Sequence, residues 1–322
     1  MRVAVLSART GWHTDELRRA LAARGHDGRV VPYEALVARL GAARGGGRPA
    51  RGLASEGEEL LDADVVLARI IPNGSLEQII YRVDALHWLE ERGVPVVNSP
   101  RAIERCVDKF YTSALLQEAG LATPETIVCE RPEDAAEAFR AMGDVVVKPL
   151  FGSMGLGMVR VSDPDTAFRV FRALEAIRSV YYLQRAVPHD GCDVRAFVVG
   201  GRVLGAIERR AVDGGWRTNV SRGGAARAVA LPAACEELAV RAARAVGADY
   251  AGVDLLPASD GTVYVLEVNG IPGWSGLQEA TGVDVAGAIV DQALARRPGG
   301  GAVGPTGTPR GTERAAAPES RP

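Results

Sequence analysis

The sequence predicts a mixed α/β and α+β fold, with a small doubly wound N-terminal domain followed by a larger region in two parts. A chain of 322 residues and 33.9 kDa exceeds one ordinary hydrophobic core and accommodates two or three compact units. An alternation of strands and helices runs twice through residues 1–98. At Ser99 this alternation gives way to a capped helix, which marks the start of a different unit.

The N-terminal elements follow from hydrophobic periodicity and from turn residues. In order, we expect a strand at 2–7, a helix at 14–24, a strand at 29–32, a loop rich in Gly and Arg at 41–52, a strand at 64–68, a helix at 76–92 and a strand at 94–98. Strands that alternate with helices imply a parallel sheet. The first turn, residues 7–12, lacks the G-x-G-x-x-G pattern of dinucleotide sites.

The second region begins with Ser99 as a helix cap and Pro100 at the first helical position. Further elements are expected as helices at 101–106, 108–118, 132–142 and 234–246 and as strands at 124–129, 144–149 and 158–161. We place the domain boundaries at 1–98, 99–186 and 187–297. Residues 298–322 are rich in Gly, Pro, Ala and charge without periodicity, which predicts a disordered tail.

Composition excludes several classes of function. A net charge of −2 and a pI near 6.2 provide no basic field for a nucleic-acid backbone. The four cysteines are far apart and have no zinc-site spacing, so we expect thiols in a reducing compartment. The N-terminus lacks a signal-peptide pattern, and no apolar run approaches the roughly 20 residues that span a bilayer. We therefore expect a cytoplasmic protein with neither nucleic acid nor a membrane as partner.

Two polar residues on an apolar strand, Glu267 and Asn269, are the strongest chemical signal in the chain. Side chains at i and i+2 share one face of a strand. Asp254 lies on the preceding strand, and Asp260-Gly261 between the two predicts a hairpin that brings it beside Glu267. Three oxygen donors of this kind suit Mg²⁺. The alternative for Glu267 and Asn269 is a polar edge strand that runs into a Gly/Pro turn.

Lys148 ends a short apolar strand and is followed by a glycine-rich segment at residues 152–157. Glycines allow backbone amides to turn toward phosphates, and the chain then resumes as a strand rather than as a helix. This order fits neither a Rossmann loop nor a P-loop. It fits a glycine-rich lid between two antiparallel strands, with Lys148 beneath it. The alternative is a Gly-rich hairpin with a solvated lysine.

Arginines are concentrated in residues 206–224, where Arg210 and Arg217 accompany Asn219 in a Gly-rich stretch. A guanidinium group can hold a carboxylate or a phosphate with two hydrogen bonds. The alternative is a solvated basic loop. Ser275 lies one residue short of a G-x-S-x-G pattern, and the histidines form no recognisable triad order, so a hydrolase is not expected.

The order of these motifs along the chain is itself informative. They run as Lys109, Lys148, the glycine-rich lid, Asp193, Arg217 with Asn219, Asp254, and Glu267 with Asn269. This order resembles the ATP-grasp superfamily, and more narrowly the RimK-type α-L-glutamate ligases, over about residues 99–297. Residues 1–98 then resemble the small domain that precedes the ATP-grasp unit in that family. The resemblance implies a two-part ATP-grasp fold.

The resemblance also implies roles for individual residues. It assigns the nucleotide to Lys109, Lys148, Gly152, Ser153, Gly155, Gly157, Gln184, Arg185, Ala186 and Asp193, the metal to Asp254, Glu267 and Asn269, and the reacting groups to Arg210, Arg217 and Asn219. One position departs from the family. The hinge strand usually presents an acidic residue to the adenine or ribose, whereas this chain has Arg185 there. The backbone of Arg185 and Ala186 remains available for an adenine contact.

The activity that the resemblance implies is an ATP- and Mg²⁺-dependent carboxylate–amine ligase, with Mn²⁺ as a possible substitute. We expect it to work through an acyl phosphate and to add L-glutamate to a small-molecule or peptide carboxylate acceptor. A homo-oligomer is usual in the family. Two alternatives stay open: a ligase for other amino acids or for a carrier protein, and an ATP-binding regulator without turnover.

Overall fold

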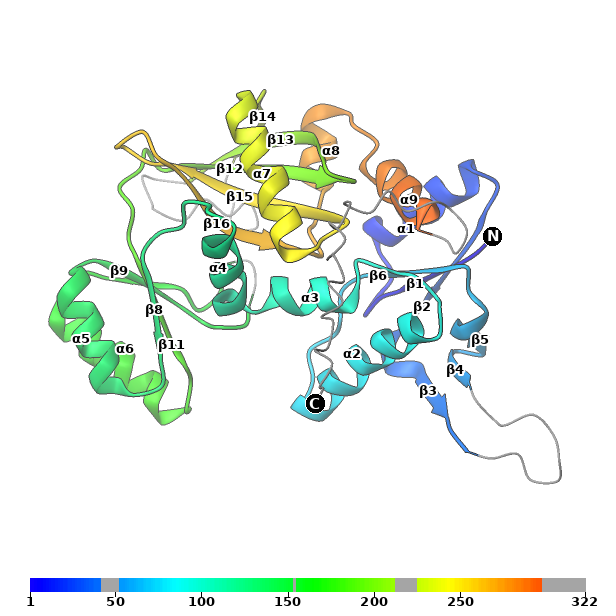
Figure 1. Cartoon of the computed structure of the whole chain (residues 1–322), viewed down its shortest axis with the longest axis horizontal. Coiled ribbons are helices and arrows are strands. Elements are labelled where there is room, and N and C mark those ends of the chain that lie inside the picture. The colour runs from blue at the N-terminus through cyan, green and yellow to red at the C-terminus, as the bar shows by residue number, and fades with distance from the viewer. Residues whose placement is uncertain (42–51, 153–154, 212–224, 297–322) are drawn as a thin grey trace, which may run out of the picture.

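The computed structural model describes residues 1–41, 52–152, 155–211 and 225–296. Its N-terminal sheet is parallel, with strand order β2-β1-β6-β7. The strands and their crossover helices are β1 (Arg2–Leu6), α1 (Trp12–Ala23), β2 (Asp27–Val31), β6 (Val65–Ala68), α2 (Leu76–Glu91) and β7 (Val96–Val97). Helices α1 and α2 cover opposite faces of this sheet (Figure 1). The predicted doubly wound α/β domain is confirmed.

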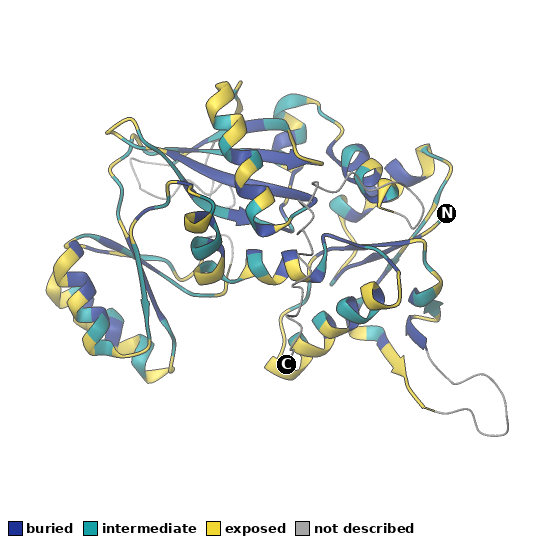
Figure 2. Ribbon diagram, in the orientation of Figure 1, coloured by how far each residue is buried: buried dark blue, intermediate teal, exposed yellow. Residues whose placement is uncertain are grey.

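Alternation along β1 explains why both faces of this sheet are apolar. Val3 and Val5 pack with α1, whereas Ala4 and Leu6 pack with α2. Because both faces are covered, the strand is apolar from Val3 to Leu6, and its one polar residue is the exposed Arg2 at its start. Figure 2 shows the buried strands between the exposed outer surfaces of the helices.

A small antiparallel sheet was not predicted from the sequence. It has the order β3-β4-β5 and contains β3 (Leu36–Arg39), β4 (Gly52–Ser55) and β5 (Glu58–Glu59). Two short helical turns, Tyr33–Ala35 and Leu60–Asp62, flank it. Gly52, expected to end a loop, instead begins β4, and the rest of that loop from residue 42 lies outside the described residues. The strand is short, and its own sequence carries little β-forming signal.

The middle unit has an antiparallel sheet of order β10-β9-β11-β8. Its elements are β8 (Thr126–Cys129), α5 (Pro132–Met142), β9 (Val145–Lys148), β10 (Val159–Val161), α6 (Pro164–Ala176) and β11 (Tyr181–Arg185). Helices α5 and α6 pack side by side against the sheet, and the buried residues form a core of their own (Figure 1). This core includes Phe139, Phe171 and Tyr181.

The C-terminal unit is built on a five-stranded antiparallel sheet of order β14-β13-β12-β15-β16. Its strands are β12 (Cys192–Val199), β13 (Arg202–Arg210), β14 (Ala225–Ala228), β15 (Tyr250–Pro257) and β16 (Val263–Asn269). Its helices are α7 (Ala233–Val246), α8 (Ser275–Thr281) and α9 (Val285–Ala295). Among the described helices, none is long and apolar enough to cross a membrane.

Two helices that follow Ser99, α3 (Pro100–Val107) and α4 (Lys109–Glu118), pack mainly on α7 and β16 of the C-terminal unit, and α4 also reaches the middle unit through side-chain hydrogen bonds. Cys106 and Leu116 share a core with α7 and β15. The Ser99 hydroxyl accepts a hydrogen bond from the Ala102 N–H at 3.1 Å, and Pro100 is at the first helical position, as the sequence predicts. The domain boundaries at residues 98, 186 and 297 stay a prediction.

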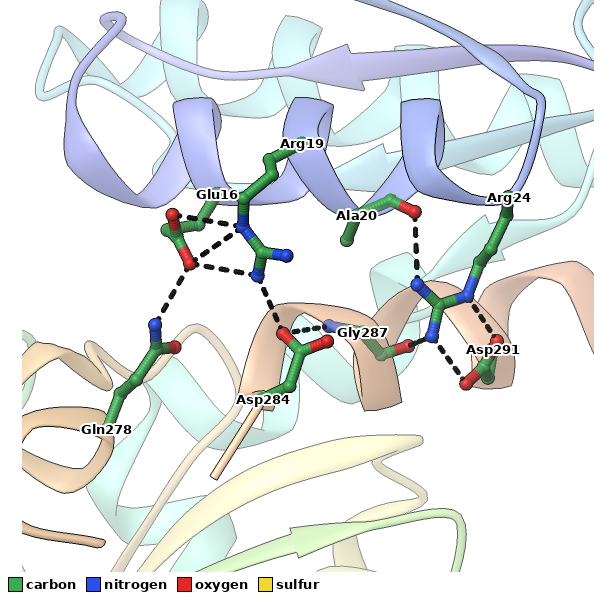
Figure 3. A network of polar contacts seen from close by, with 8 residues as sticks. All are labelled: Glu16, Arg19, Ala20, Arg24, Gln278, Asp284, Gly287 and Asp291. Carbon is green, nitrogen blue, oxygen red and sulfur yellow. Dashed lines mark hydrogen bonds and ion pairs between the residues drawn. The ribbon is translucent and has the colours of Figure 1, made fainter. Parts of the chain in front are cut away.

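The N-terminal and C-terminal units share one continuous apolar core. Val3 and Leu17 of the first unit and Phe197 and Ile289 of the second belong to the same cluster. Ion pairs between α1 and α9 reinforce the junction (Figure 3). Arg24 binds both carboxylate oxygens of Asp291, at 2.6 and 2.8 Å. These two units therefore pack as one body.

Candidate active site

A cleft lies between the middle unit and the C-terminal sheet, and most of the residues singled out from the sequence line it. Those that do are Lys109, Lys148, Gly155, Gln184, Arg185, Ala186, Asp193, Asp254 and Glu267. The cleft wall also contains Val146, Met158, Leu256 and Leu266. Charged side chains from both units converge among these apolar residues, as expected for a site that binds a charged ligand.

The hairpin of β15 and β16 gathers the predicted metal ligands on one face. Asp254 lies directly opposite Glu267, and Asn269 lies opposite Gly252. The turn is closed by the Thr262 N–H, which donates to the Asp260 carboxylate at 2.9 Å. The expected hairpin and its register are therefore confirmed.

Two arginines hold Asp254, and the sequence analysis did not pair them with it. Arg195 Nε and Nη2 donate to the two carboxylate oxygens at 2.7 and 2.6 Å, and Arg209 Nη2 lies 3.1 Å from Oδ2. Burial alone raises the pKa of Asp254, but the guanidinium groups of Arg195 and Arg209 outweigh it and lower this pKa to about 2. The residue therefore stays ionised although its side chain is buried.

Asp193, expected to contact the nucleotide, is paired with Arg209 in this structure. Arg209 Nε and Nη2 donate to its carboxylate oxygens at 2.7 and 2.6 Å, and both side chains are buried. Register explains both arginine pairs, because Arg195 lies opposite Asp254 and Asp193 lies opposite Arg209 across neighbouring strands. The sheet thus carries an alternating array of carboxylates and guanidinium groups, of which Asp193, Arg209 and Asp254 line the cleft.

Lys148 is half-buried at the end of β9, where its Nζ donates to Gln184 Oε1 at 2.5 Å. Burial lowers its pKa, and the nearby charge of Lys109 adds to this effect. The carboxylates of Glu267 and Asp254 act in the opposite direction, and the resulting pKa is about 8. Lys148 therefore faces the acidic pair across the cleft.

A polar chain behind Lys148 fixes its position, and sequence reasoning did not predict it. Gln184 Nε2 donates to Thr126 Oγ1 at 3.0 Å and to the Tyr182 hydroxyl at 3.3 Å. The Tyr182 hydroxyl is in turn 2.8 Å from Ser113 Oγ on α4. The only sign of this chain in the sequence is a polar residue, Gln184, within the β11 segment. In the structure its side chain is buried, at 3% exposure.

The glycine-rich lid connects β9 to β10, which pair as antiparallel strands. Gly152, Gly155 and Gly157 all have positive φ, at 149, 66 and 75°. Lys109 Nζ donates to the carbonyl oxygen of Gly152 at 2.9 Å, so the lid rests on this lysine. Ser153 lies outside the described residues.

The hinge at Arg185 and Ala186 differs from the family pattern in a way that the structure explains. Arg185 Nε donates to Glu125 Oε2 at 2.8 Å, so the arginine is neutralised by an acidic partner from outside the hinge strand. The Arg185 N–H donates to the Glu125 carbonyl and the Ala186 N–H to the Asp144 carbonyl. Both N–H groups are engaged within the protein, so neither is free to donate to an adenine ring, and an adenine contact would have to use other groups.

The candidate reacting groups are placed only in part. Arg210 is exposed, lies 3.4 Å from Glu208 and is not among the described residues that line the cleft. Arg217 and Asn219 lie outside the described residues. Their assignments stay a prediction.

The donor set of the hairpin fits a hard divalent ion. Glu267 offers carboxylate oxygens and Asn269 an amide oxygen, the donor types that Mg²⁺ takes in proteins. Asp254 would bind through Oδ1, which accepts from Arg195 alone, because Oδ2 is held by both Arg195 and Arg209. The described residues contain no group of three His, Cys, Asp or Glu side chains placed to hold a metal, so Asn269 would supply the third protein ligand. The Asn269 amide nitrogen lies 3.5 Å from the Gly252 carbonyl, which leaves its oxygen for a ligand.

Comparison with known proteins identifies the family. Residues 106–293 match the RimK-like ATP-grasp domain, and residues 1–103 match the RimK PreATP-grasp domain. The chain belongs to the RimK-like ATP-grasp family. It is therefore an ATP-dependent ligase of the class that forms carbon–nitrogen bonds. The resemblance inferred from the motifs and the predicted fold class are both confirmed.

Similar ligases have different acceptors in their names. A tetrahydromethanopterin:α-L-glutamate ligase of Methanosarcina acetivorans is 36% identical over 263 residues, which are 73% of this chain and 81% of the relative. A ribosomal protein bS6–L-glutamate ligase of Escherichia coli O139:H28 is 33% identical over 294 residues, which are 90% and 94% of the two chains.

Solved structures share the fold of this ATP-grasp ligase. A RimK domain ATP-grasp protein from Sphaerobacter thermophilus has a TM-score of 0.69 at 26% identity and covers 91% of this chain and 100% of its own. The ATP-grasp ligase PsnB, solved with a minimal precursor, Mg and ADP, has a TM-score of 0.68 at 24% identity and covers 91% and 97%.

Proposed function

We propose that this ATP-grasp ligase adds L-glutamate to a carboxylate-bearing acceptor in a Mg²⁺-dependent reaction through an acyl phosphate. The observation that supports this most strongly is the pairing of Asp254 with Glu267 opposite Lys148 in one cleft. The relatives named above are both L-glutamate ligases, one for a pterin cofactor and one for a ribosomal protein. The acceptor proposed here is accordingly a small molecule or a peptide that ends in a carboxylate.

The chemistry follows from leaving groups. An amine cannot displace oxide from a carboxylate, so an acceptor carboxylate oxygen first attacks the γ-phosphorus of ATP and ADP leaves. The amino group of glutamate then attacks the carbonyl carbon of the acyl phosphate, an amide bond forms, and inorganic phosphate leaves with its bonding electrons. The amine releases a proton in this step.

The residues of the chain would stabilise negative charge in the reaction and exclude water from it. The ammonium group of Lys148 and the guanidinium groups that line the cleft would stabilise negative charge that develops on the transferring phosphoryl group. Bound Mg²⁺ would neutralise phosphate charge beside Asp254, Glu267 and Asn269. The glycine-rich lid would keep water from the acyl phosphate, which water would otherwise hydrolyse.

A release assay with a matched control tests this proposal. We would incubate the protein with MgATP, L-glutamate and a panel of pterin and peptide carboxylates, measure ADP, and identify products by mass spectrometry. Glu267→Gln should lower turnover by about 10²- to 10³-fold, the usual loss for one electrostatic contact to the transition state. Glu279→Gln, the same change at an exposed position of α8, should leave turnover unchanged. Full ligation by Glu267→Gln would refute the metal assignment.

A further inference from the structure

Asn98, at the carboxyl end of β7 in the N-terminal sheet, uses its whole side chain to bind the backbone of the metal hairpin. Its Nδ2 donates to the carbonyl oxygens of Tyr250 and Gly270 at 2.8 and 2.5 Å. Its Oδ1 accepts from the N–H groups of Asp249 and Tyr250 at 2.6 and 3.1 Å. A carboxamide has two donors and two acceptor lone pairs, and all four are used here. The side chain is fully buried.

These bonds replace strand pairing at the point where the hairpin opens. The ladder between β15 and β16 ends at the pair Gly252 and Asn269. Tyr250 and Gly270 lie just beyond that pair, and the Asn98 amide bridges their carbonyl oxygens. Gly270 directly follows Asn269, so the bridge fixes the backbone next to a proposed metal ligand.

Arg69, at the carboxyl end of β6, makes a second connection of the same kind. Its Nη1 donates to the Tyr250 hydroxyl and its Nη2 to the Pro272 carbonyl, each at 3.1 Å. Its guanidinium carbon lies 4.6 Å from the ring centroid of Trp274, a favourable cation–π distance. No ion pair links Arg69 to an acidic group among the described residues, so neutral groups, including the Tyr250 ring at 6.0 Å, surround this buried side chain.

The loop that both residues hold packs closely on β15. A Cβ atom at Gly252 would lie 3.0 Å from the Cβ of Pro272, so a side chain there would press on the loop at 270–274. Neither Asn98 nor Arg69 is among the described residues that line the cleft. Their influence on the site therefore passes through the backbone and the side chains that they contact.

We propose that Asn98 and Arg69 are positioning residues through which the N-terminal domain fixes the geometry of the metal-binding hairpin. This inference rests on the proposed function, because it takes Asp254, Glu267 and Asn269 as the metal ligands. It assigns the N-terminal domain a part in metal binding although that domain contributes no ligand. Asn269 and Glu267 are nearest to the bridge along the chain and should respond most.

The test measures metal binding rather than turnover. Mn²⁺ would be titrated into the full-length protein with saturating ADP, and free Mn²⁺ followed by electron paramagnetic resonance. Asn98→Asp replaces the amide donor by an oxygen atom that would face the carbonyl oxygens of Tyr250 and Gly270. Arg69→Met removes the two N–H donors to Tyr250 and Pro272 but keeps an apolar side chain. Each should weaken Mn²⁺ binding by roughly 10- to 100-fold, as do changes that disturb groups supporting metal ligands. ADP affinity without metal should stay unchanged, because the adenine hinge belongs to the middle unit.

Ser55→Ala is the matched control. Ser55 is also fully buried in the N-terminal domain, and its hydroxyl donates to the Pro32 carbonyl at 2.6 Å rather than to a group of the hairpin. This variant should lose thermal stability and keep its Mn²⁺ affinity. Should Asn98→Asp fail to fold, Arg69→Met alone decides the question.

The outcomes separate this inference from the function on which it rests. Equal Mn²⁺ affinity in the wild type and Arg69→Met, while Glu267→Gln binds Mn²⁺ weakly, would overturn the positioning role and leave the metal site standing. Equal loss of Mn²⁺ affinity in Ser55→Ala would also overturn it. Unchanged Mn²⁺ binding in Glu267→Gln would instead contradict the metal assignment.

Discussion

The ammonium group of Lys148 is half-buried in the cleft, and this affects nucleotide binding. Its pKa is lowered to about 8, so the ammonium group loses its proton as pH rises through that value. Phosphate oxygens need the charged form. The affinity for ADP should therefore fall as pH rises from about 7 to about 9. Isothermal titration calorimetry across this pH range measures the affinity for ADP.

Lys148→Met provides the comparison, because it has no charge to lose. Its ADP affinity should be weaker at neutral pH and should lack the decline near pH 8. A decline of the same size in this variant would show that another group is responsible.

Arg209 is the residue on which two buried carboxylates depend. It holds Asp193 with two hydrogen bonds and also contacts Asp254, and all three side chains are at most 7% exposed. Arg209→Met would leave Asp193 without this guanidinium partner in a buried place. We expect the free energy of unfolding to fall by about 3–5 kcal/mol. Urea denaturation measures this change.

The neighbouring Arg210 is a natural control for that experiment. It is exposed, and its contact with Glu208 at 3.4 Å is a surface ion pair. Arg210→Met should change the free energy of unfolding by less than about 1 kcal/mol. If the two substitutions destabilise the protein equally, the buried pair is not what makes Arg209 important.

At the scale of single elements, the lid depends on glycine for a steric reason as well as for flexibility. A Cβ at Gly157 would lie 2.8 Å from Cγ of Pro149, and its φ is +75°. Gly157→Ala should therefore displace the lid, slow ligation and increase the fraction of ATP hydrolysed without product. The ratio of product to phosphate measures this uncoupling.

Gly261 in the β15–β16 turn serves as the control for backbone strain. Its φ is +86°, and a Cβ atom at this position would have no heavy atom within 4 Å. Gly261→Ala should lower stability without changing the ratio of product to phosphate. Uncoupling of similar size in both variants would rule out a specific role for the lid.

Turns and helix starts depend on residues that are neighbours in the sequence, and these elements were predicted correctly. The Asp260-Gly261 turn predicted the hairpin, and Ser99 with Pro100 predicted the start of α3. The partners of Asp254 could not be predicted in this way, because Arg195 precedes it by 59 residues and meets it only through strand pairing. The small sheet at β3–β5 was missed since one of its strands follows a long Gly-rich loop. Long-range register is the information that a single sequence lacks.

At the scale of the whole molecule, the chain has two mechanical parts. The N-terminal and C-terminal units share one core, whereas the middle unit has its own. We expect native-state hydrogen exchange to show this division. Amides of β1 and β12 should exchange with the same free energy of opening, and those of β9 and β11 with a lower one.

Nucleotide binding should raise the free energies of opening of both parts of the molecule. Saturation at 100 times the dissociation constant adds about 2.7 kcal/mol to any opening that destroys the site. The cleft lies between the two parts, so both should gain. If β1 opened at a much lower free energy than β12, the shared core would not unite the two outer units.

The most direct test of the account follows the oxygen atoms of the acceptor. A carboxylate acceptor labelled with heavy oxygen, identified in the panel above, would be ligated to L-glutamate with MgATP by the wild-type protein and by Glu267→Gln. We expect one labelled oxygen to appear in the inorganic phosphate for each amide bond formed by the wild type, and little of either product from the variant. Amide formation with unlabelled phosphate would contradict the acyl-phosphate reaction, and equal rates for the two proteins would contradict the metal site.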